Sequence, residues 1–180
     1  MSERTAFGFA RTECACAECV RNCQHMPGYL IPEDLPTMAA ALGYDDWYQF
    51  ARENLAASVG ATVLTSEGQV CQIPTLVPQR QAGGACKFLR AEGRCTLHAI
   101  SPFGCSFFDC QQSKAEADAR SVRGLQQIAQ DWAMRGMYAH LWLFLDAHGI
   151  RAVPPLEAKA RLREATARRA GERVCHALSA

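Results

Sequence analysis

The spacing of apolar residues predicts two short helices in the first third of the chain. Residues 33–42 open with proline and acidic residues that fit a first helical turn, and they are followed by Gly43, a typical helix stop. Apolar residues from Trp47 to Leu55 recur near the helical period. Asp45 and Asp46 can cap a second helix that begins at Trp47, because their side chains accept hydrogen bonds from the free amides of a first helical turn. We therefore expect two helices before the middle of the chain.

A short β-hairpin is expected next. Two β-prone runs, residues 61–65 and 69–73, flank a glycine-containing turn. Cys71 lies in the second run and is interpreted as a small buried hydrophobe. Residues 74–84 contain proline and glycine and predict a loop, in which Arg80 is interpreted as a solvated cation.

Helical periodicity returns in the last third of the chain. Apolar residues recur from Ser121 to about Gly149, with glycines as weak points, and predict one long or broken helix that supports the core. Two prolines at positions 154 and 155 end this pattern. Residues 156–178 then predict a surface helix with a thin apolar stripe and a basic face.

Together these elements predict a mainly α fold with a small β-hairpin and irregular, cysteine-rich loops that are organised by metal. We expect one compact domain, in which residues 1–120 form a cysteine-cluster metal-binding region and residues 121–180 form a helical support and the basic C-terminal helix. The cysteine spacings differ between the two halves of the metal-binding region, so no internal repeat is predicted.

Composition narrows the class of protein. The chain has 180 residues, of which 49% are hydrophobic, so an ordinary core can form without covalent staples. The formal net charge is +1, which gives no support for binding to nucleic acid or to an anionic membrane. The N-terminus lacks the apolar stretch of a secretory signal, and the apolar run at residues 137–145 is too short to cross a bilayer. We therefore expect a cytoplasmic protein.

Eight of the ten cysteines fall into two groups of four. The first group is Cys14, Cys16, Cys19 and Cys23, and the second is Cys86, Cys95, Cys105 and Cys110. Four thiolates complete a tetrahedral zinc site or the outer ligands of an iron–sulfur cluster. Without an export signal a disulfide framework is disfavoured, so all eight cysteines are predicted metal ligands.

The spacing within the groups favours iron over zinc. The first group is compact enough to surround one centre, whereas the gaps in the second group do not match the paired knuckles of a zinc ribbon. Glycines near the second group permit close backbone approach, and neighbouring phenylalanines and leucines supply apolar cover. The expected cofactor is therefore an iron–sulfur cluster of the 4Fe–4S type, with Zn²⁺ as the alternative.

Three segments in the second group carry a family resemblance. The segments are Cys86-Lys-Phe-Leu89, Gly93-Arg-Cys95-Thr-Leu-His98 and Ser101-Pro-Phe-Gly-Cys105-Ser-Phe-Phe108. They resemble the YkgJ-like cysteine-cluster family, a zinc- or iron-chelating domain also found in flagellin lysine N-methylase. The resemblance implies metal ligation by Cys86, Cys95 and Cys105 and by the N-terminal cysteines as a group. His98 stands where the family often has tyrosine, and it could ligate, hydrogen-bond to a sulfur or merely pack.

No catalytic residue is predicted, because the common nucleophile, phosphate-loop and zinc-peptidase motifs are absent from the sequence. The expected function is that of a metal-binding protein, with an iron–sulfur centre in redox chemistry or electron transfer or in the metal part of an oxidoreductase. Its partner would be a redox protein or a small-molecule substrate. The alternatives are a zinc-stapled protein-binding module and a thiol-based redox sensor.

Overall fold

The fold is taken from a computed structural model, which describes residues 20, 23–24, 27–64, 67–82, 84–100, 102–106 and 113–152. Its helices are α2 (Asp34–Ala41), α3 (Trp47–Asn54), the short 3-10 helix η1 (His98–Ile100), α4 (Phe103–Ser106), α5 (Lys114–Met134) and α6 (Met137–Ala147). Its strands are β1 (Leu55–Leu64) and β2 (Val70–Pro78).

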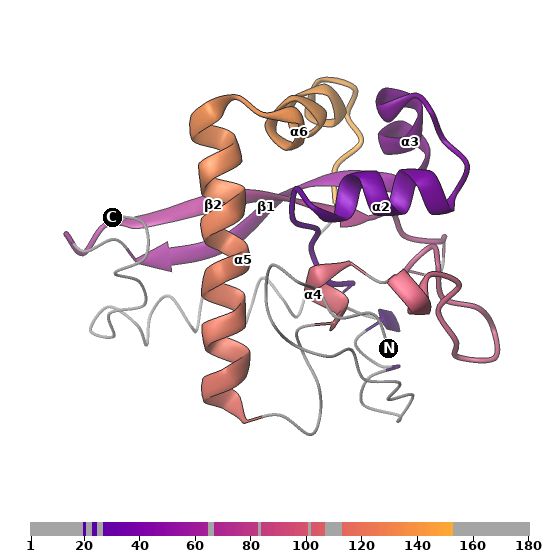
Figure 1. Cartoon of the computed structure of the whole chain (residues 1–180), viewed down its shortest axis with the longest axis horizontal. Coiled ribbons are helices and arrows are strands. Elements are labelled where there is room, and N and C mark those ends of the chain that lie inside the picture. Colours follow the sequence, from indigo (N-terminus) through magenta and orange to yellow (C-terminus); the bar gives the residue numbers. More distant parts are fainter. Residues whose placement is uncertain are drawn as a thin grey trace.

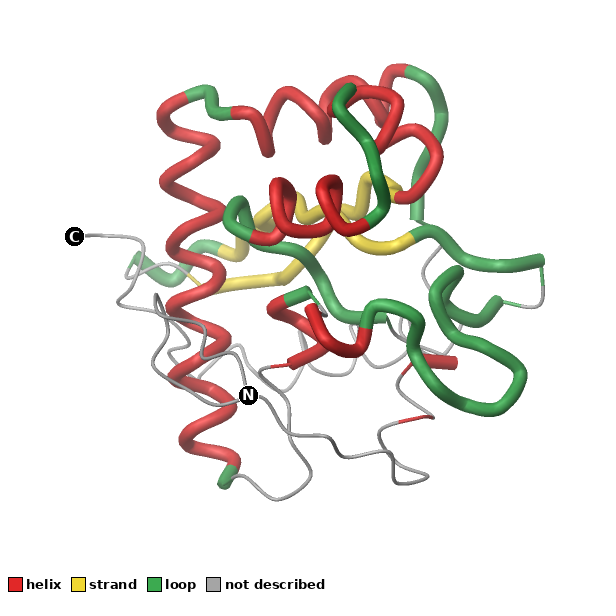
Figure 2. The backbone as a smooth tube through the Cα atoms, turned by 45° about the vertical axis from the view of Figure 1, so that its right-hand side comes forward, coloured by secondary structure: helices red, strands yellow, loops and turns green. Residues whose placement is uncertain are grey.

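The two strands form a long antiparallel hairpin, and the helices lie around it. Leu55 pairs with Pro78 at one end of the ladder and Leu64 pairs with Val70 at the other. Helices α3 and α6 pack on β1, while α5 crosses the hairpin and contacts β2 (Figure 1). Helix α4 and the loop that contains residues 84–100 lie together on another side of the hairpin (Figure 2).

Tyr138 of α6 joins three parts of the core. Its fully buried hydroxyl donates a hydrogen bond to the Leu30 carbonyl (2.8 Å) and accepts one from the Leu76 amide of β2 (2.7 Å). The Tyr138 hydroxyl therefore links three elements inside an apolar core: the segment before α2, the strand β2 and the helix α6. The largest fully buried side chains around this point include Phe50, Phe103, Leu35, Met38, Leu55, Ile128, Leu141 and Leu145.

The predicted hairpin is present, but it is longer than expected and the loop predicted at residues 74–84 is partly wrong. Strand β2 continues to Pro78, and Pro74 lies inside it. Pro74 is tolerated there because β1 carries a bulge between Ser58 and Ala61, where the pairing register shifts and a ladder amide is not needed. Gly60 in that bulge has a φ of +80°.

The helix predictions hold with shifted ends. Helix α3 begins at Trp47 as expected, because the Asp46 carboxylate accepts hydrogen bonds from the Tyr48 and Gln49 amides (2.8 and 3.1 Å). The long helical stretch is broken, as the glycines suggested, into α5 and α6. Helix α5 starts seven residues before the expected Ser121, at a capping box formed by Ser113 and Glu116. The predicted helix at residues 156–178 lies outside the described residues.

The expected fold class is wrong in two respects. The hairpin is a central element with strands of ten and nine residues rather than a small addition. The cysteine-rich loops are held by hydrogen bonds of the protein itself: the Gln81 side-chain amide, for example, donates to the Cys86 and Leu89 carbonyls (3.1 and 2.8 Å). Among the described residues, no group of three or more His, Cys, Asp or Glu side chains is arranged to hold a metal ion. In their described parts, these loops are therefore organised by the protein's own hydrogen bonds.

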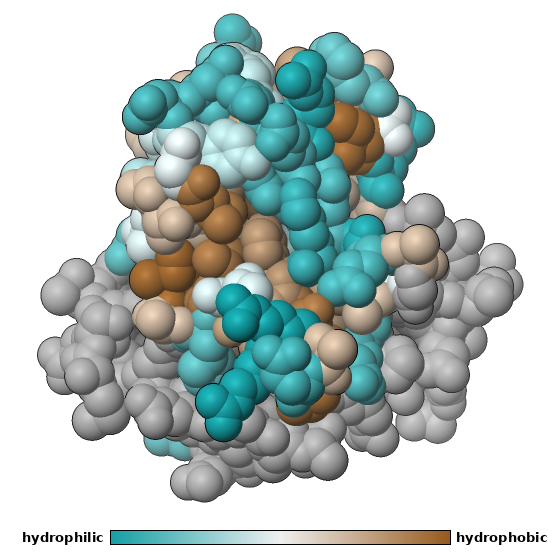
Figure 3. Space-filling model, turned by 90° about the vertical axis from the view of Figure 1, so that its right-hand side faces the viewer, coloured by the Kyte–Doolittle hydropathy of each residue, from teal (hydrophilic) through white to brown (hydrophobic). Residues whose placement is uncertain are grey.

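Apolar residues are also present on the surface. Figure 3 shows a side of the molecule on which hydrophilic side chains predominate and apolar side chains gather in a band beside the residues drawn in grey. Large exposed apolar side chains include Val59 and Val70 of the hairpin and Met134 at the end of α5. In the part of the chain described, no helix combines the length and the apolar character needed to cross a membrane.

Tyr138→Phe should lower the free energy of unfolding by about 2–4 kcal/mol, because it leaves the buried Leu76 amide and Leu30 carbonyl without their partner. Tyr48→Phe is the matched control, since Tyr48 is 43% exposed, and it should change stability by less than about 0.5 kcal/mol. Urea unfolding followed by circular dichroism measures both. Equal stability of the two variants would contradict the role given to Tyr138.

Candidate sulfur centre

Four cysteines from three separate segments meet in the described structure. They are Cys23 near the N-terminus, Cys86 and Cys95 in the loop after β2, and Cys105 in α4. Each of the four thiols lies close enough to act electrostatically on the other three. The structure therefore joins one member of the first cysteine group to three members of the second, and we refer to these four residues as the sulfur centre.

Backbone hydrogen bonds and one very close backbone contact bring the three segments together. The Cys86 amide donates to the Cys23 carbonyl (2.9 Å), and the Gly104 amide donates to the Tyr29 carbonyl (2.8 Å). Gly28 lies directly against Gly104: a Cβ on Gly28 would be 2.1 Å from the Gly104 carbonyl carbon. Only glycine permits this approach, which places Cys105 beside the segment that follows Cys23.

The buried carboxylate of Asp34 fixes the same junction. Its side chain accepts hydrogen bonds from the Ile31 amide and from the Phe103 amide, each at 2.8 Å. Asp34 is only 3% exposed, so these two amides compensate part of the cost of burying its charge. The start of α2 is thereby tied to the start of α4, two residues before Cys105.

Cys86 and Cys95 lie at equivalent positions in two consecutive loops of nine residues, 80–88 and 89–97. In the first loop Gln81 N donates to Ala85 O (2.8 Å), and in the second Arg90 N donates to Arg94 O (2.9 Å). The sequences of the loops share an alanine, a glycine and the cysteine at matching positions.

The equivalence extends to the other backbone contacts of these loops. Each cysteine forms an isolated antiparallel bridge with the first residue of its loop, Arg80 with Cys86 and Leu89 with Cys95. The glycine two residues before each cysteine has positive φ, +88° at Gly84 and +79° at Gly93. We call this feature the loop repeat. The sequence analysis missed it because the comparison was made between whole cysteine groups rather than within one.

Burial and backbone amides set the electrostatics of the sulfurs. Burial raises the pKa of Cys86 to about 11, while the Phe88 amide and, more weakly, Arg80 act in the opposite direction. Burial also raises the pKa of Cys105 well above its ordinary value, against a hydrogen bond from the Gly28 amide. The pKa of Cys23 is raised by burial and by Cys95. Burial thus favours the neutral form of these three thiols.

The arrangement is that of close neighbours rather than of a closed single-ion site. The described cysteines lie within electrostatic reach of each other, yet none of the groups they form meets the closeness that one metal ion requires. Phe88, Leu97 and Phe103 are buried in the same core cluster as Cys86 and supply apolar cover, as the sequence predicted.

The other four predicted ligands, Cys14, Cys16, Cys19 and Cys110, lie outside the described residues. His98 is exposed in η1, where its amide donates to the Cys95 carbonyl (3.2 Å). Cys71 lies in β2 opposite Val63 and is half-buried rather than buried.

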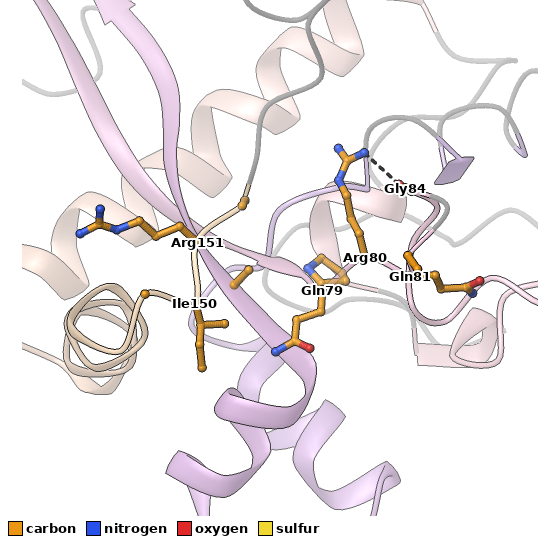
Figure 4. Close-up of a pocket in the computed structure, with 11 residues that line it drawn as sticks. Gln79, Arg80, Gln81, Gly84, Ile150 and Arg151 are labelled. Carbon is orange, nitrogen blue, oxygen red and sulfur yellow. Dashed lines mark hydrogen bonds between the residues drawn. The ribbon is translucent and has the colours of Figure 1, made fainter.

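A cleft of about 460 Å³ adjoins the loop repeat. Residues 78–82 and Gly84 line one side of it, and residues 149–152 line the other (Figure 4). Arg80 stands on the first side with its guanidinium directed at the Gly84 carbonyl (2.9 Å), whereas Arg151 points away from Arg80 and pairs with Asp146 (2.5 Å). Arg80 was expected to be solvated, but it is half-buried between this cleft and Cys86.

Comparisons of the chain with protein-family models, with curated proteins and with solved structures found no match. The resemblance to the YkgJ-like family therefore stays a prediction.

The raised pKa of Cys86 predicts a loss of stability at alkaline pH. The folded protein holds this thiol neutral up to a pKa of about 11, whereas its ordinary value is 9.0. The unfolded chain therefore loses this proton first as pH rises, and the free energy of unfolding should fall by up to about 2–3 kcal/mol between pH 9 and pH 11. Urea unfolding of reduced, metal-free protein measures this. Cys86→Ala should flatten the profile relative to Cys71→Ala, and identical profiles would contradict the prediction.

Proposed function

We propose that this chain is an iron–sulfur protein with a redox or electron-transfer role, in which the thiolates of Cys23, Cys86, Cys95 and Cys105 hold the cluster. The observation that carries the proposal is the meeting of four cysteines, from three segments of the chain, in one partly buried place. Thiolate sets of this size are the usual ligands of such clusters.

The number and grouping of the thiols support a cluster as the proposed cofactor. In a 4Fe–4S cluster each cysteine binds a different iron, so four thiolates surround it. The four described thiols all act on each other electrostatically, which agrees with four ligands of one centre. Zn²⁺ bound by four thiolates is the alternative.

The hydrogen bonds around the loops also favour a functional centre over a structural staple. A structural zinc supplies folding energy to segments that lack their own support. Here Gln81, Asp34 and the loop repeat already hold the cysteine-bearing segments. The Phe88 and Gly28 amides directed at Cys86 and Cys105 are contacts of the kind that tune the potential of a cluster.

The residues of the chain have clear tasks in this proposal. The loops hold the sulfurs under apolar cover, and the four thiols release their protons on loading because only thiolates bind the metal. The bound cluster supplies one-electron transfer. A redox protein or a small-molecule substrate would exchange electrons with it. Four neighbouring cysteines that are not joined in disulfides fit a reducing compartment, so we place the protein in the cytoplasm.

The family resemblance agrees with this assignment. It implies ligation by Cys86, Cys95 and Cys105, which are three of the four cysteines of the sulfur centre. We propose membership of the YkgJ-like family on this ground, with no methyltransferase activity attached to it.

Anaerobic purification followed by iron, sulfide and zinc analysis tests the proposal. We expect brown protein with iron and acid-labile sulfide and broad visible absorption. Colourless protein with stoichiometric zinc would replace the proposal with a zinc-stapled binding module. Metal-free protein that stays folded and forms defined disulfides under oxidant would replace it with a thiol sensor.

Cys95→Ser should remove most of the bound iron, because a neutral hydroxyl replaces a soft thiolate. Cys71→Ser is the matched control and should keep the wild-type iron content, since Cys71 lies in β2, away from the loops. Iron per folded protein, measured with circular dichroism on the same samples, separates metal loss from unfolding. Undiminished iron in a folded Cys95→Ser protein would exclude Cys95 as a ligand.

A further inference from the structure

The two loops of the loop repeat carry different residues at the position opposite the cysteine. Residues 80–88 and 89–97 share their backbone hydrogen bonds, their left-handed glycine and their cysteine. Facing the cysteine, however, the first loop carries Arg80 and the second carries Leu89. Leu89 occupies the position in the second loop that Arg80 occupies in the first, and both loops have the same backbone hydrogen bonds. The backbone conformation of the first loop therefore does not require an arginine at position 80.

The bridge geometry places the Arg80 side chain close to the Cys86 sulfur. The hydrogen bonds Lys87 N to Gln79 O and Gln81 N to Ala85 O flank the bridge, so Arg80 and Cys86 form a non-hydrogen-bonded antiparallel pair. Directly opposed residues of such a pair point to the same face and have the closest side chains of any strand pair. The Arg80 guanidinium is then anchored by the Gly84 carbonyl of the same loop (2.9 Å; Figure 4).

We propose that Arg80 is the positioning residue that compensates the negative charge of the sulfur centre from the Cys86 side. This inference rests on the proposed function. Four thiolates leave a bound metal centre negatively charged, and a partly buried negative charge is costly unless a cation stands beside it. Arg80 brings a permanent positive charge to that place, since a guanidinium does not lose its proton in proteins.

The charge of Arg80 has two consequences for a loaded centre. It stabilises the negatively charged, metal-bound form of the centre and so slows metal loss. It also favours the reduced state, which carries one more negative charge, and so raises the reduction potential. In the second loop the equivalent residue is the apolar Leu89, so no positive charge stands opposite Cys95 at this position. The charge of this residue pair therefore lies on the Cys86 side of the centre.

The two loops supply their own matched variants. Arg80→Leu gives the first loop the residue of the second, while Arg94→Ala removes one positive charge at a position where the first loop has Ala85. Arg80→Lys keeps the charge, and the double variant Arg80→Leu/Leu89→Arg moves it from Cys86 to Cys95. The measurements are the reduction potential of the anaerobically reconstituted cluster and the rate of iron release to a chelator.

We expect Arg80→Leu to release iron about tenfold faster than wild type and to lower the reduction potential, as loss of an outer-shell partner does at metal sites. Arg94→Ala should behave as wild type, and both Arg80→Lys and the charge-moving double variant should recover most of each loss. Equal behaviour of Arg80→Leu and Arg94→Ala would overturn the inference.

Failure of both Arg80→Lys and the double variant to recover the loss would also overturn it, since the role of Arg80 would then be packing. If wild-type protein takes up no cluster, the proposed function itself fails, and the result is visible before any variant is made.

Discussion

The backbone contact between Gly28 and Gly104 is the constraint on which the rest of the site depends. It brings a segment near the N-terminus against α4 at a distance that no side chain other than hydrogen allows. Asp34 fixes the same contact by accepting from amides on both sides of it. This contact places Cys105 next to the segment that follows Cys23. The hydrogen bond from the Cys86 amide to the Cys23 carbonyl then connects the third segment to the other two. The four thiols are thus neighbours because of contacts in which sulfur takes no part.

Local sequence signals identified the helices but not the full hairpin. Asp46 caps α3 and the glycine at position 136 separates α5 from α6, and both effects depend on residues close in sequence. The first half of β1 gave no such signal, because Ala56, Ala57 and Ser58 have no apolar alternation. That half is a strand because of distant partners: Ala57 pairs with Leu76 and also accepts and donates hydrogen bonds with residues 150 and 152. Tertiary contacts of this kind are not visible in local periodicity.

The candidate site was predictable in its residue types but not in its assembly. Spacing alone marked Cys23, Cys86, Cys95 and Cys105 as ligands, together with four further cysteines that the described residues do not include. It could not show that Cys23 joins the second group, because that depends on the contact of Gly28 with Gly104.

The expectation that metal organises these loops was wrong for a related reason. The hydrogen bonds of Gln81 and Asp34, neither of which belongs to one of the cysteine motifs, provide that order. A site assembled in this way holds its sulfurs in place before metal binds, as suits a centre that changes redox state without rearrangement of its surroundings.

X-ray absorption at the metal edge of anaerobically purified wild-type protein tests whether these four sulfurs share one iron–sulfur centre. We expect an iron edge with sulfur ligands only and a short iron–iron distance, and the loss of sulfur scattering when Cys23, Cys86, Cys95 and Cys105 are all replaced by serine. A spectrum with nitrogen or oxygen ligands and no neighbouring iron, or one unchanged by those four replacements, would contradict it.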